Sequence, residues 1–350
     1  MIMKPLEKYV INESNRFSAL GRYAKDLSIA LNAELFTLRL DSSMNVKSYD
    51  GQVLSPSNLL KIGNGWYFNH LFPSISLNKI KSEINRKLSG DALIHYSSQG
   101  IPRLNLKNQF VYTVHDLFGL DKKYNKDPKL IRLLRRNLKQ VFLSRKIITV
   151  SNLVRSKLEE YEGNIEICTI YPPISPSFVR IEEKEKIRKE LNLPLHKRLI
   201  LSVSSTDPRK NLEAVFRTKK ILGENYEIVR VGKQLNGEYS FRNVEDDVLN
   251  KIYNACDVLL YPSLDEGFGY PIVEAMTVGL PVVASNIEVF KEVAGDSAIL
   301  VEPTAENLSN GIITILNDAD NYKQKGLIKS KQFTFEVFRA KLKEFYDHLE

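Results

Sequence analysis

The second half of the chain alternates short apolar runs with longer stretches whose apolar residues recur at helical spacing. The apolar runs have the length of strands, and polar turns separate them from the helical stretches. The predicted strands cover 199–203, 226–231, 258–261, 281–284 and 298–301, and the predicted helices lie near 211–222, 245–255, 271–279, 287–294 and 305–317. Strict alternation of this kind is typical of parallel strands with helices on both faces. The sequence therefore predicts a doubly wound α/β domain.

The first half repeats this pattern less regularly. Its predicted strands lie near 8–12, 34–40, 92–96, 110–114 and 147–150, with helices near 17–32, 128–144 and 151–161. Residues 42–91 are irregular, and the aromatic run at 66–70 either stacks on an acceptor or belongs to a small satellite core. The segment YPPISPS at 171–177 is the expected linker between two domains. Two such domains would hold a ligand between the carboxyl ends of their sheets.

Composition limits the class of protein. The 350 residues are 43% hydrophobic and 26% charged, as in ordinary globular proteins. The two cysteines, Cys168 and Cys256, have no neighbouring partner and indicate a reducing compartment or simple use in the core. The start of the chain lacks the apolar stretch of a signal peptide, and no run approaches the roughly 20 apolar residues of a spanning helix. We expect a cytoplasmic protein, either soluble or peripheral at the inner membrane face.

Charge is divided unevenly along the chain. Residues 1–175 carry 26 Lys and Arg against 15 Asp and Glu, a net charge of +11, and the remaining residues carry 24 against 27, a net charge of −3. Segment 122–146 alone has ten Lys and Arg and one Asp. Asp127 and Pro128 predict a helix start, and an apolar stripe follows. The segment is either a packing helix with a basic polar face or a surface that meets anionic lipid headgroups or a phosphorylated acceptor.

Two carboxylates, Glu266 and Glu274, bracket the sequence GFGYP after the predicted strand 258–261. Glycine lets backbone N–H groups approach a ligand closely, and Pro271 fits the first turn of a helix whose N-terminus carries partial positive charge. Glu266 is then expected on the loop and Glu274 about one turn inside the helix. Such a site suits a polyhydroxyl or phosphorylated ligand; the alternative is an ordinary strand, turn and helix with two surface glutamates.

A second motif, SVSSTDPRKNLEAV, covers 202–215. A strand ends, Asp207 and Pro208 turn the chain, and Arg209 and Lys210 stand just before a predicted helix. Two cations are poorly placed at the positive end of a helix dipole, so the arrangement favours a bound anion. The alternative is a pair of solvated surface charges.

Together these segments resemble the retaining, GT-B-fold nucleotide-sugar glycosyltransferases of the family 4 type, the glycosyl transferases group 1. The form E-G-F-G-x-P-x-x-E-A-M with its E-x(7)-E spacing carries the resemblance, supported by TDPRKN, by FSALGRYAKDL around Gly21, and by VYTVHDL with His115. The resemblance implies two Rossmann-like domains that face each other across a cleft. Residues 1–175 would bind the acceptor, 176–332 the nucleotide sugar, and 333–350 would form a helix that crosses back to the first domain.

The resemblance also implies roles for individual residues. Arg209 and Lys210 would bind the donor diphosphate, Glu266 and His115 would contact the sugar, and Glu274 would hold the ribose. The catalytic residues that it implies are His115, Glu266, Arg209 and Lys210, and the donor-binding residues are Gly21, Ser204, Gly267, Phe268, Gly269, Tyr270 and Glu274. The anomeric configuration would be retained, by attack on the face that the leaving group departs from.

No cofactor or metal is expected, because the positive side chains would neutralise the diphosphate. The five histidines lack ligand-like spacing, and the D-x-D at 318–320 lies in NDADN, which is typical of a surface turn. The implied reaction moves glucose or mannose from a UDP or GDP sugar to a glycan or a lipid-linked oligosaccharide.

Two other functions remain open on the sequence. One is a phosphorylase or another sugar-phosphate-using enzyme of the same fold, and a second is a non-catalytic relative that binds through its basic half. Nucleic-acid binding is not expected, since no motif for it appears. The segment after Val231 and Gly232 is shorter than in the family, which leaves the base of the nucleotide open.

Overall fold

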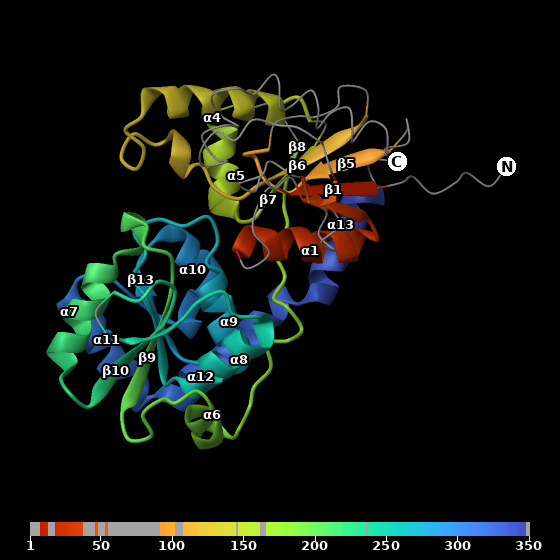
Figure 1. The fold of residues 1–350 in the computed structure, drawn as a ribbon. Helices are drawn as coiled ribbons and strands as arrows, with labels where there is room; N and C mark the ends of the chain where they lie inside the picture. The colour runs from red at the N-terminus through yellow and green to blue at the C-terminus, as the bar shows by residue number, and fades with distance from the viewer. Residues whose placement is uncertain are drawn as a thin grey trace. The chain divides into compact units, whose positions relative to one another are not determined.

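The computed structural model describes residues 8–12, 18–37, 46–47, 53–54, 92–101, 108–144, 146–161, 166–235 and 237–347. The chain forms two compact units. Unit 1 comprises Met1–Pro172 and Phe338–Glu350, and unit 2 comprises Pro173–Val337. Each unit is an α/β domain with a six-stranded parallel sheet, so the predicted fold class is confirmed (Figure 1). The aromatic run at 66–70 lies outside the described residues.

Unit 1 is built on the strand order β2-β1-β5-β6-β7-β8. Its strands are β1 (Lys8–Asn12), β2 (Glu34–Thr37), β5 (Leu93–Tyr96), β6 (Phe110–Val114), β7 (Lys146–Thr149) and β8 (Glu166–Thr169), beside a small antiparallel pair, β3 (Val46–Lys47) and β4 (Val53–Leu54). Its helices are α1 (Ala19–Leu31), α4 (Pro128–Val141) and α5 (Asn152–Glu159), with the 3₁₀ turn η1 (Phe118–Leu120). The predicted cap of α4 is confirmed, because the side chain of Asp127 accepts a hydrogen bond from the amide of Lys129 at 2.9 Å.

The apolar stripe of α4 packs inside unit 1. Ile131, Leu138 and Val141 are buried, whereas the basic side chains on the opposite side of the helix are exposed. The helix is shorter than the predicted 128–144. It ends at Val141 because the chain turns there, and the Ser144 hydroxyl donates to the carbonyl of Phe110 at 2.9 Å.

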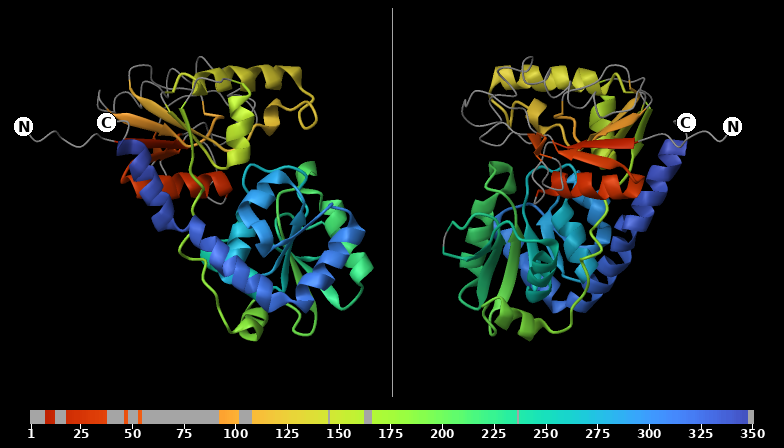
Figure 2. Two further views of the ribbon diagram at one scale, coloured as in Figure 1. Left: turned by 180° about the vertical axis from the view of Figure 1, so that it is seen from behind. Right: turned by 45° about the vertical axis from the view of Figure 1, so that its right-hand side comes forward.

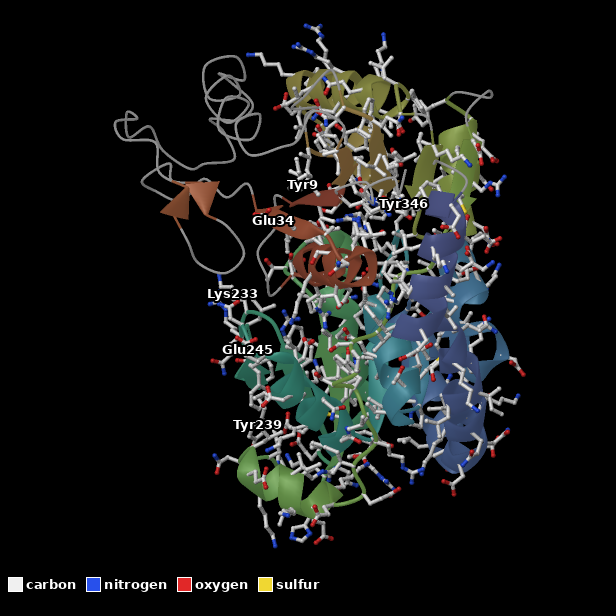
Figure 3. All side chains as sticks on the ribbon, turned by 90° about the vertical axis from the view of Figure 1, so that its right-hand side faces the viewer. Tyr9, Glu34, Lys233, Tyr239, Glu245 and Tyr346 are labelled. Atoms are coloured by element: carbon white, nitrogen blue, oxygen red, sulfur yellow. The ribbon has the colours of Figure 1, made fainter. Side chains whose placement is uncertain are left out.

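Helix α13 (Phe335–Asp347) contributes its residues from Phe338 onward to unit 1. The hydroxyl of Tyr346, labelled in Figure 3, lies 2.7 Å from Nδ1 of His95, and Nε2 of His95 lies 2.8 Å from the hydroxyl of Thr113. The Tyr23 hydroxyl of α1 meets the same Thr113 at 2.9 Å. Burial and the nearby His115 lower the pKa of His95 to about 3, so this network is neutral and ties the last helix to the sheet.

Unit 2 has the strand order β11-β10-β9-β12-β13-β14, and all neighbouring strands are parallel. The strands are β9 (Arg198–Val203), β10 (Tyr226–Val231), β11 (Tyr239–Phe241), β12 (Val258–Tyr261), β13 (Val282–Ser285) and β14 (Ile299–Val301). The helices are α6 (Lys184–Glu190), α7 (Leu212–Leu222), α8 (Asp246–Ala255), α9 (Tyr270–Val278), α10 (Glu288–Ala294), α11 (Ala305–Asn317) and α12 (Ala319–Ser330), with 3₁₀ turns η2 (Pro208–Lys210), η3 (Gly295–Ser297) and η4 (Lys331–Phe333).

Helices cover both faces of this second sheet. Helices α7 and α11 pack against each other on one face, and α8, α9 and α12 lie on the other, as the views in Figures 1 and 2 show. The chain first builds outward from β9 to β10 and β11, and then returns to place β12 on the other side of β9. The strand order therefore reverses between β9 and β12, which is where ligands bind in open sheets of this kind.

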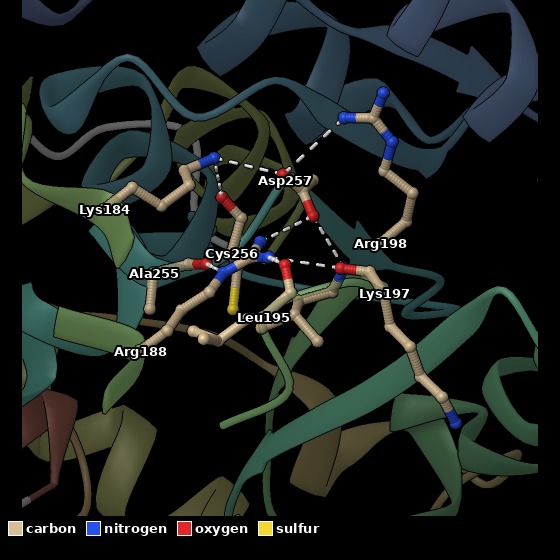
Figure 4. A network of polar contacts seen from close by, with 9 residues as sticks. Lys184, Arg188, Leu195, Lys197, Arg198, Ala255, Cys256 and Asp257 are labelled. Carbon is tan, nitrogen blue, oxygen red and sulfur yellow. Dashed lines mark hydrogen bonds and ion pairs between the residues drawn. The ribbon is translucent and has the colours of Figure 1, made fainter. Parts of the chain in front are cut away.

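A buried carboxylate fastens the opposite end of the same two strands (Figure 4). Asp257, just before β12, accepts hydrogen bonds from the amide of Leu199 at 2.7 Å, from Arg188 at 2.8 Å and from Lys184 at 3.1 Å. Burial alone would raise the pKa of Asp257, but these positive charges and the amide together hold it below its usual value. The network joins α6 to the amino ends of β9 and β12.

None of the helices in the described residues is long and apolar enough to cross a membrane.

Candidate functional site

The candidate site of unit 2 lies where β9 and β12 end side by side. The loop after β9 carries Arg209 and Lys210, and the loop after β12 carries Glu266. A backbone hydrogen bond of 2.7 Å from the amide of Leu264 to the carbonyl of Arg209 joins the two loops. The strand order thus brings together side chains that are more than 50 positions apart in the chain.

The centre of the site is a cluster of Lys210, Glu266 and Tyr261. The ammonium group of Lys210 is paired with the carboxylate of Glu266. The buried hydroxyl of Tyr261 donates to the same carboxylate oxygen at 2.6 Å and accepts from Lys210 at 3.3 Å. Burial, and then the negative charge of Glu266, raise the pKa of Tyr261 well above its ordinary value, so its proton is retained. The tyrosine fixes both charged groups at the end of β12.

Arg209 is held by a carboxylate of its own loop. Asp207 accepts from the Arg209 amide at 2.9 Å and from its guanidinium at 2.9 and 3.2 Å. Burial alone would raise the pKa of Asp207, but its hydrogen bonds with Arg209 lower it. Both cations that the sequence predicts to bind an anion are therefore positioned by carboxylates.

The glycine-bearing loop turns directly into α9. Gly269 has φ of 114°, and a Cβ there would lie 3.0 Å from the ring of Phe290, so both the backbone angle and the space favour glycine. Phe268 is buried between the rings of Tyr270 and Phe333, whose centroids lie 5.5 and 5.6 Å away. The loop is held by aromatic packing beneath it, with Pro271 in the first turn of α9 as predicted.

Glu274 lies about one turn inside α9, as predicted, but it is only 1% exposed. The Tyr253 hydroxyl of α8 donates to its carboxylate at 2.5 Å. A carboxylate that receives a strong hydrogen bond from one side is oriented by it. The geometry excludes the alternative of two solvent-exposed surface glutamates, since Glu266 is buried as well.

The loop that follows β10 is held by a buried ion pair. Arg230 is fully buried, and its guanidinium donates to the carbonyls of Ser204 and Lys233, each at 3.1 Å. Glu238 lies 3.6 Å from the guanidinium and accepts from the amide of Leu235 at 2.9 Å. Strand β11 then pairs in parallel with β10 after a connection that contains no helix in its described residues. Figure 3 shows Lys233, Tyr239 and Glu245 along this edge of unit 2.

Gly21 and His115 both belong to unit 1. The amide of Gly21, in the first turn of α1, donates to the hydroxyl of the capping Ser18 at 3.0 Å. The ring of His115 meets the edge of Tyr23 with centroids 4.7 Å apart.

The protonation of His115 follows from its surroundings. Its Nε2 lies 2.8 Å from the carbonyl of Ser97, which can only accept, so Nε2 carries the proton and Nδ1 is an acceptor. Burial lowers the pKa of His115 to about 4, and the ring is neutral at pH 7.

The described residues contain no cluster of three or more His, Cys, Asp or Glu side chains that could hold a metal ion. The D-x-D at 318–320 is not a continuous surface turn, because only Asp318 lies between helices and Asp320 is in the first turn of α12. The Asp318 carboxylate accepts a hydrogen bond from the side-chain amide of Asn321 at 2.8 Å.

The family model described as "Glycosyl transferases group 1" matches residues 183–332, which carry Arg209, Lys210, Glu266 and Glu274. Residues 183–332 are a glycosyl transferases group 1 domain. The resemblance seen in the sequence is confirmed for this part of the chain.

The chain is also similar to two mannosyltransferases. The chain is 29% identical over 222 residues to "O-antigen chain mannosyltransferase RfbU" of Salmonella typhimurium, covering 57% of this chain and 58% of that protein. It is 28% identical over 263 residues to "O-antigen chain mannosyltransferase B" of Escherichia coli, covering 65% of this chain and 67% of that protein. The first match thus spans less than two thirds of the relative's length.

A solved structure shows the same fold over both units. The structure of Anabaena HepE in complex with UDP-glucose superposes with a TM-score of 0.74 at 16% identity, covering 98% of this chain and all of the other. At this identity the likeness concerns the fold, which is the predicted GT-B class.

Several residues of the group 1 domain's site were not predicted from the sequence. Tyr261 directly precedes the loop and was assigned only to the strand, and Tyr253 lies on a helix with no motif of its own. Asp207 was identified as a turn residue, yet it also holds the guanidinium of Arg209. A polar hydroxyl at the end of an apolar strand, as in Tyr261, is the signal that points to a site at the sheet edge.

Proposed function

We propose that this protein is a glycosyltransferase that moves mannose, with retention of the anomeric configuration, from a nucleoside-diphosphate sugar to a hydroxyl group of a glycan acceptor. The observation that carries the proposal is the meeting of Lys210 and Glu266 at the point where the strand order reverses, inside a glycosyl transferases group 1 domain. Mannose, rather than glucose, is favoured by the names of the two relatives. UDP-glucose in the related HepE structure supports a nucleotide sugar as donor.

In the proposed reaction the bond between the anomeric carbon and the diphosphate oxygen breaks, and both electrons leave with the nucleoside diphosphate. The acceptor hydroxyl oxygen forms the new bond, and its proton leaves with the diphosphate. Negative charge therefore grows on the leaving group, where Arg209 and Lys210 stabilise it. The ammonium group of Lys210 has three hydrogens, and its contacts with Tyr261 and Glu266 leave one for a phosphate oxygen. No metal is required in this scheme.

The remaining residues bind and orient the donor. Glu274, oriented by Tyr253, accepts hydrogen bonds from the ribose hydroxyls, and Glu266 with the loop amides from Phe268 to Tyr270 holds the sugar. His115, neutral with Nδ1 as acceptor, takes a hydrogen bond from a sugar hydroxyl.

The proposal is tested by calorimetric titration of the purified protein with UDP, GDP and ADP. We expect one nucleotide to bind at micromolar concentration and an Arg209→Ala, Lys210→Ala double variant to lose at least tenfold in affinity. The matched control is a Lys186→Ala, Arg217→Ala variant, which removes two exposed cations from the same unit. If a folded protein binds none of the three nucleotides, the proposal fails.

The released product distinguishes a transferase from the alternative, a phosphorylase or another sugar-phosphate-using enzyme. A transferase releases a nucleoside diphosphate from GDP-mannose or UDP-glucose in the presence of acceptor. Release of inorganic phosphate from a hexose 1-phosphate, without any nucleotide, would instead identify a phosphorylase.

A further inference from the structure

The exposed side of α4 forms one wall of a basic groove in unit 1, far in the chain from the loops that follow β9 and β12. The groove has a volume of about 810 Å³. It is lined by Lys122, Asn125, Lys126, Pro128, Ile131, Arg132, Arg135, Arg136 and Lys139, hereafter the α4 groove. Six of these nine residues are cations and none is acidic.

Within the described part of the chain, none of the six cationic side chains makes an ion pair or a hydrogen bond. The two nearest carboxylates in the sequence serve the backbone instead, because Asp121 accepts from the amide of Lys123 at 2.8 Å and Asp127 caps α4. Other cations of unit 1 do find partners, as in the pairs Lys146 with Glu166 and Arg155 with Glu159. The described residues of the protein therefore leave the positive charge of the α4 groove without a paired carboxylate.

The cations are arranged along one side of the helix. Arg132, Arg135, Arg136 and Lys139 follow the spacing i, i+3, i+4 and i+7, which places them in one row. Like charges at this spacing destabilise a helix, so the row is costly unless an anion binds to it. From the first to the last cation the row spans about 10 Å of helix axis, which is longer than a single phosphate group.

The packing of α4 excludes the insertion of this helix into a lipid bilayer. A helix that inserts into lipid needs a free apolar face, but Ile131, Leu138 and Val141 are buried within unit 1. The cations line a concave groove, whereas a flat bilayer would meet a protruding surface. A compact and highly charged ligand fits these features better. Arginine contributes to such a site by binding phosphate oxygens with two N–H groups at once.

We propose that the α4 groove binds a diphosphate group, and that the ligand is the phosphorylated end of the acceptor. The identity of the ligand as acceptor rests on the proposed function, whereas the diphosphate site itself does not. The row of arginines takes the phosphate oxygens, Lys122 and Lys126 close the groove from the turn before α4, and Ile131 with Pro128 provides an apolar wall for the adjoining part of the ligand.

The test is calorimetric titration of the full chain with inorganic diphosphate, in an Arg209→Ala, Lys210→Ala background that removes the proposed anion site of unit 2. We expect an Arg132→Gln, Arg135→Gln, Arg136→Gln variant to bind at least tenfold more weakly. A Lys25→Gln, Lys129→Gln, Lys157→Gln variant removes the same charge from unit 1 outside the groove, and its affinity should stay within twofold. Inorganic monophosphate should bind at least tenfold more weakly than diphosphate.

Two results would overturn the proposal. Equal weakening in both triple variants, each shown by circular dichroism to be folded, would mean that only net charge matters. Sedimentation with phosphatidylglycerol vesicles at low salt, without any binding of diphosphate, would mean that this face meets an acidic membrane. Nucleotide binding by the wild-type protein reports on unit 2 separately, so failure of the groove and failure of the donor site are distinguishable.

Discussion

Replacing Tyr261 by Phe removes one hydroxyl from the centre of the candidate site and leaves the ring in place. The hydroxyl donates to Glu266 at 2.6 Å in a buried position, and a hydrogen bond to a charged group contributes about 1.5–3 kcal/mol. We therefore expect the Tyr261→Phe change to lower the free energy of unfolding of unit 2 by about 2 kcal/mol. For a domain of this size that corresponds to a fall of about 4–8 °C in the melting midpoint.

The pH dependence gives a sharper signature of the same hydroxyl. Burial and then Glu266 raise the pKa of Tyr261 in the folded protein, whereas in the unfolded chain it titrates near 10. The stability that comes from the raised pKa is fully present below pH 10 and is lost as the pH rises above 10. The variant lacks this contribution, so the difference in melting midpoint between the two proteins should shrink between pH 9 and pH 11.

The assay is thermal unfolding followed by circular dichroism at pH 8, 9, 10 and 11. Tyr239→Phe is the matched control, because this tyrosine of unit 2 is 39% exposed and should change the free energy of unfolding by less than about 0.5 kcal/mol. A Tyr261→Phe midpoint that equals the wild-type value at pH 8, or a difference that stays constant up to pH 11, would refute this account of the cluster.

Three further predictions concern other parts of the structure. Asp257→Asn should lower the free energy of unfolding of unit 2 by about 3 kcal/mol, since it leaves the buried Arg188 without its negatively charged partner. The exposed Asp296→Asn control should be neutral in the same urea titration. Gly269→Ala should lower the free energy of unfolding by about 1–3 kcal/mol, because alanine is strained at a φ of 114°. The change should also weaken nucleotide binding measured by calorimetry, and an unchanged affinity would contradict a role for the loop. Burial lowers the pKa of His115 from 6.5 to about 4, so the free energy of unfolding of unit 1 should fall by up to about 3 kcal/mol as the pH falls from 6.5 to 4. His115→Gln should remove that part of the loss, as measured by urea titrations at pH 7 and pH 4.5.

Five of the six strands of unit 2 were predictable to within a residue or two because each is an apolar run bounded by polar turns. Strand β10 was predicted at 226–231 and is observed at Tyr226–Val231. Helix α6 was missed, since its sequence KEKIRKE is almost entirely polar and its position depends on the ion pair with Asp257. Edge strand β11 was missed because three residues give too little periodicity for a prediction.

The polar residues of the loops after β9 and β12 could be identified from the sequence, but their pairings could not. Local motifs identify Lys210 and Glu266 as polar residues that follow strands. Their contact arises from β12 lying beside β9, a property of sheet order that no local pattern encodes. Tyr261 could not be predicted for the same reason, because its hydroxyl contacts both Lys210 and Glu266 only when the loops after β9 and β12 lie side by side.

Unit 1 combines Met1–Pro172 with Phe338–Glu350, and this affects the order in which the two units can fold during synthesis. During synthesis, all of unit 2 leaves the ribosome before the residues of α13 that complete unit 1. The sheet of unit 1 emerges first, yet it must wait for Tyr346 to reach His95. In nascent chains that lack α13, unit 2 should therefore resist protease while unit 1 is still cleaved. This order is the reverse of the usual one, in which the domain that is made first also folds first.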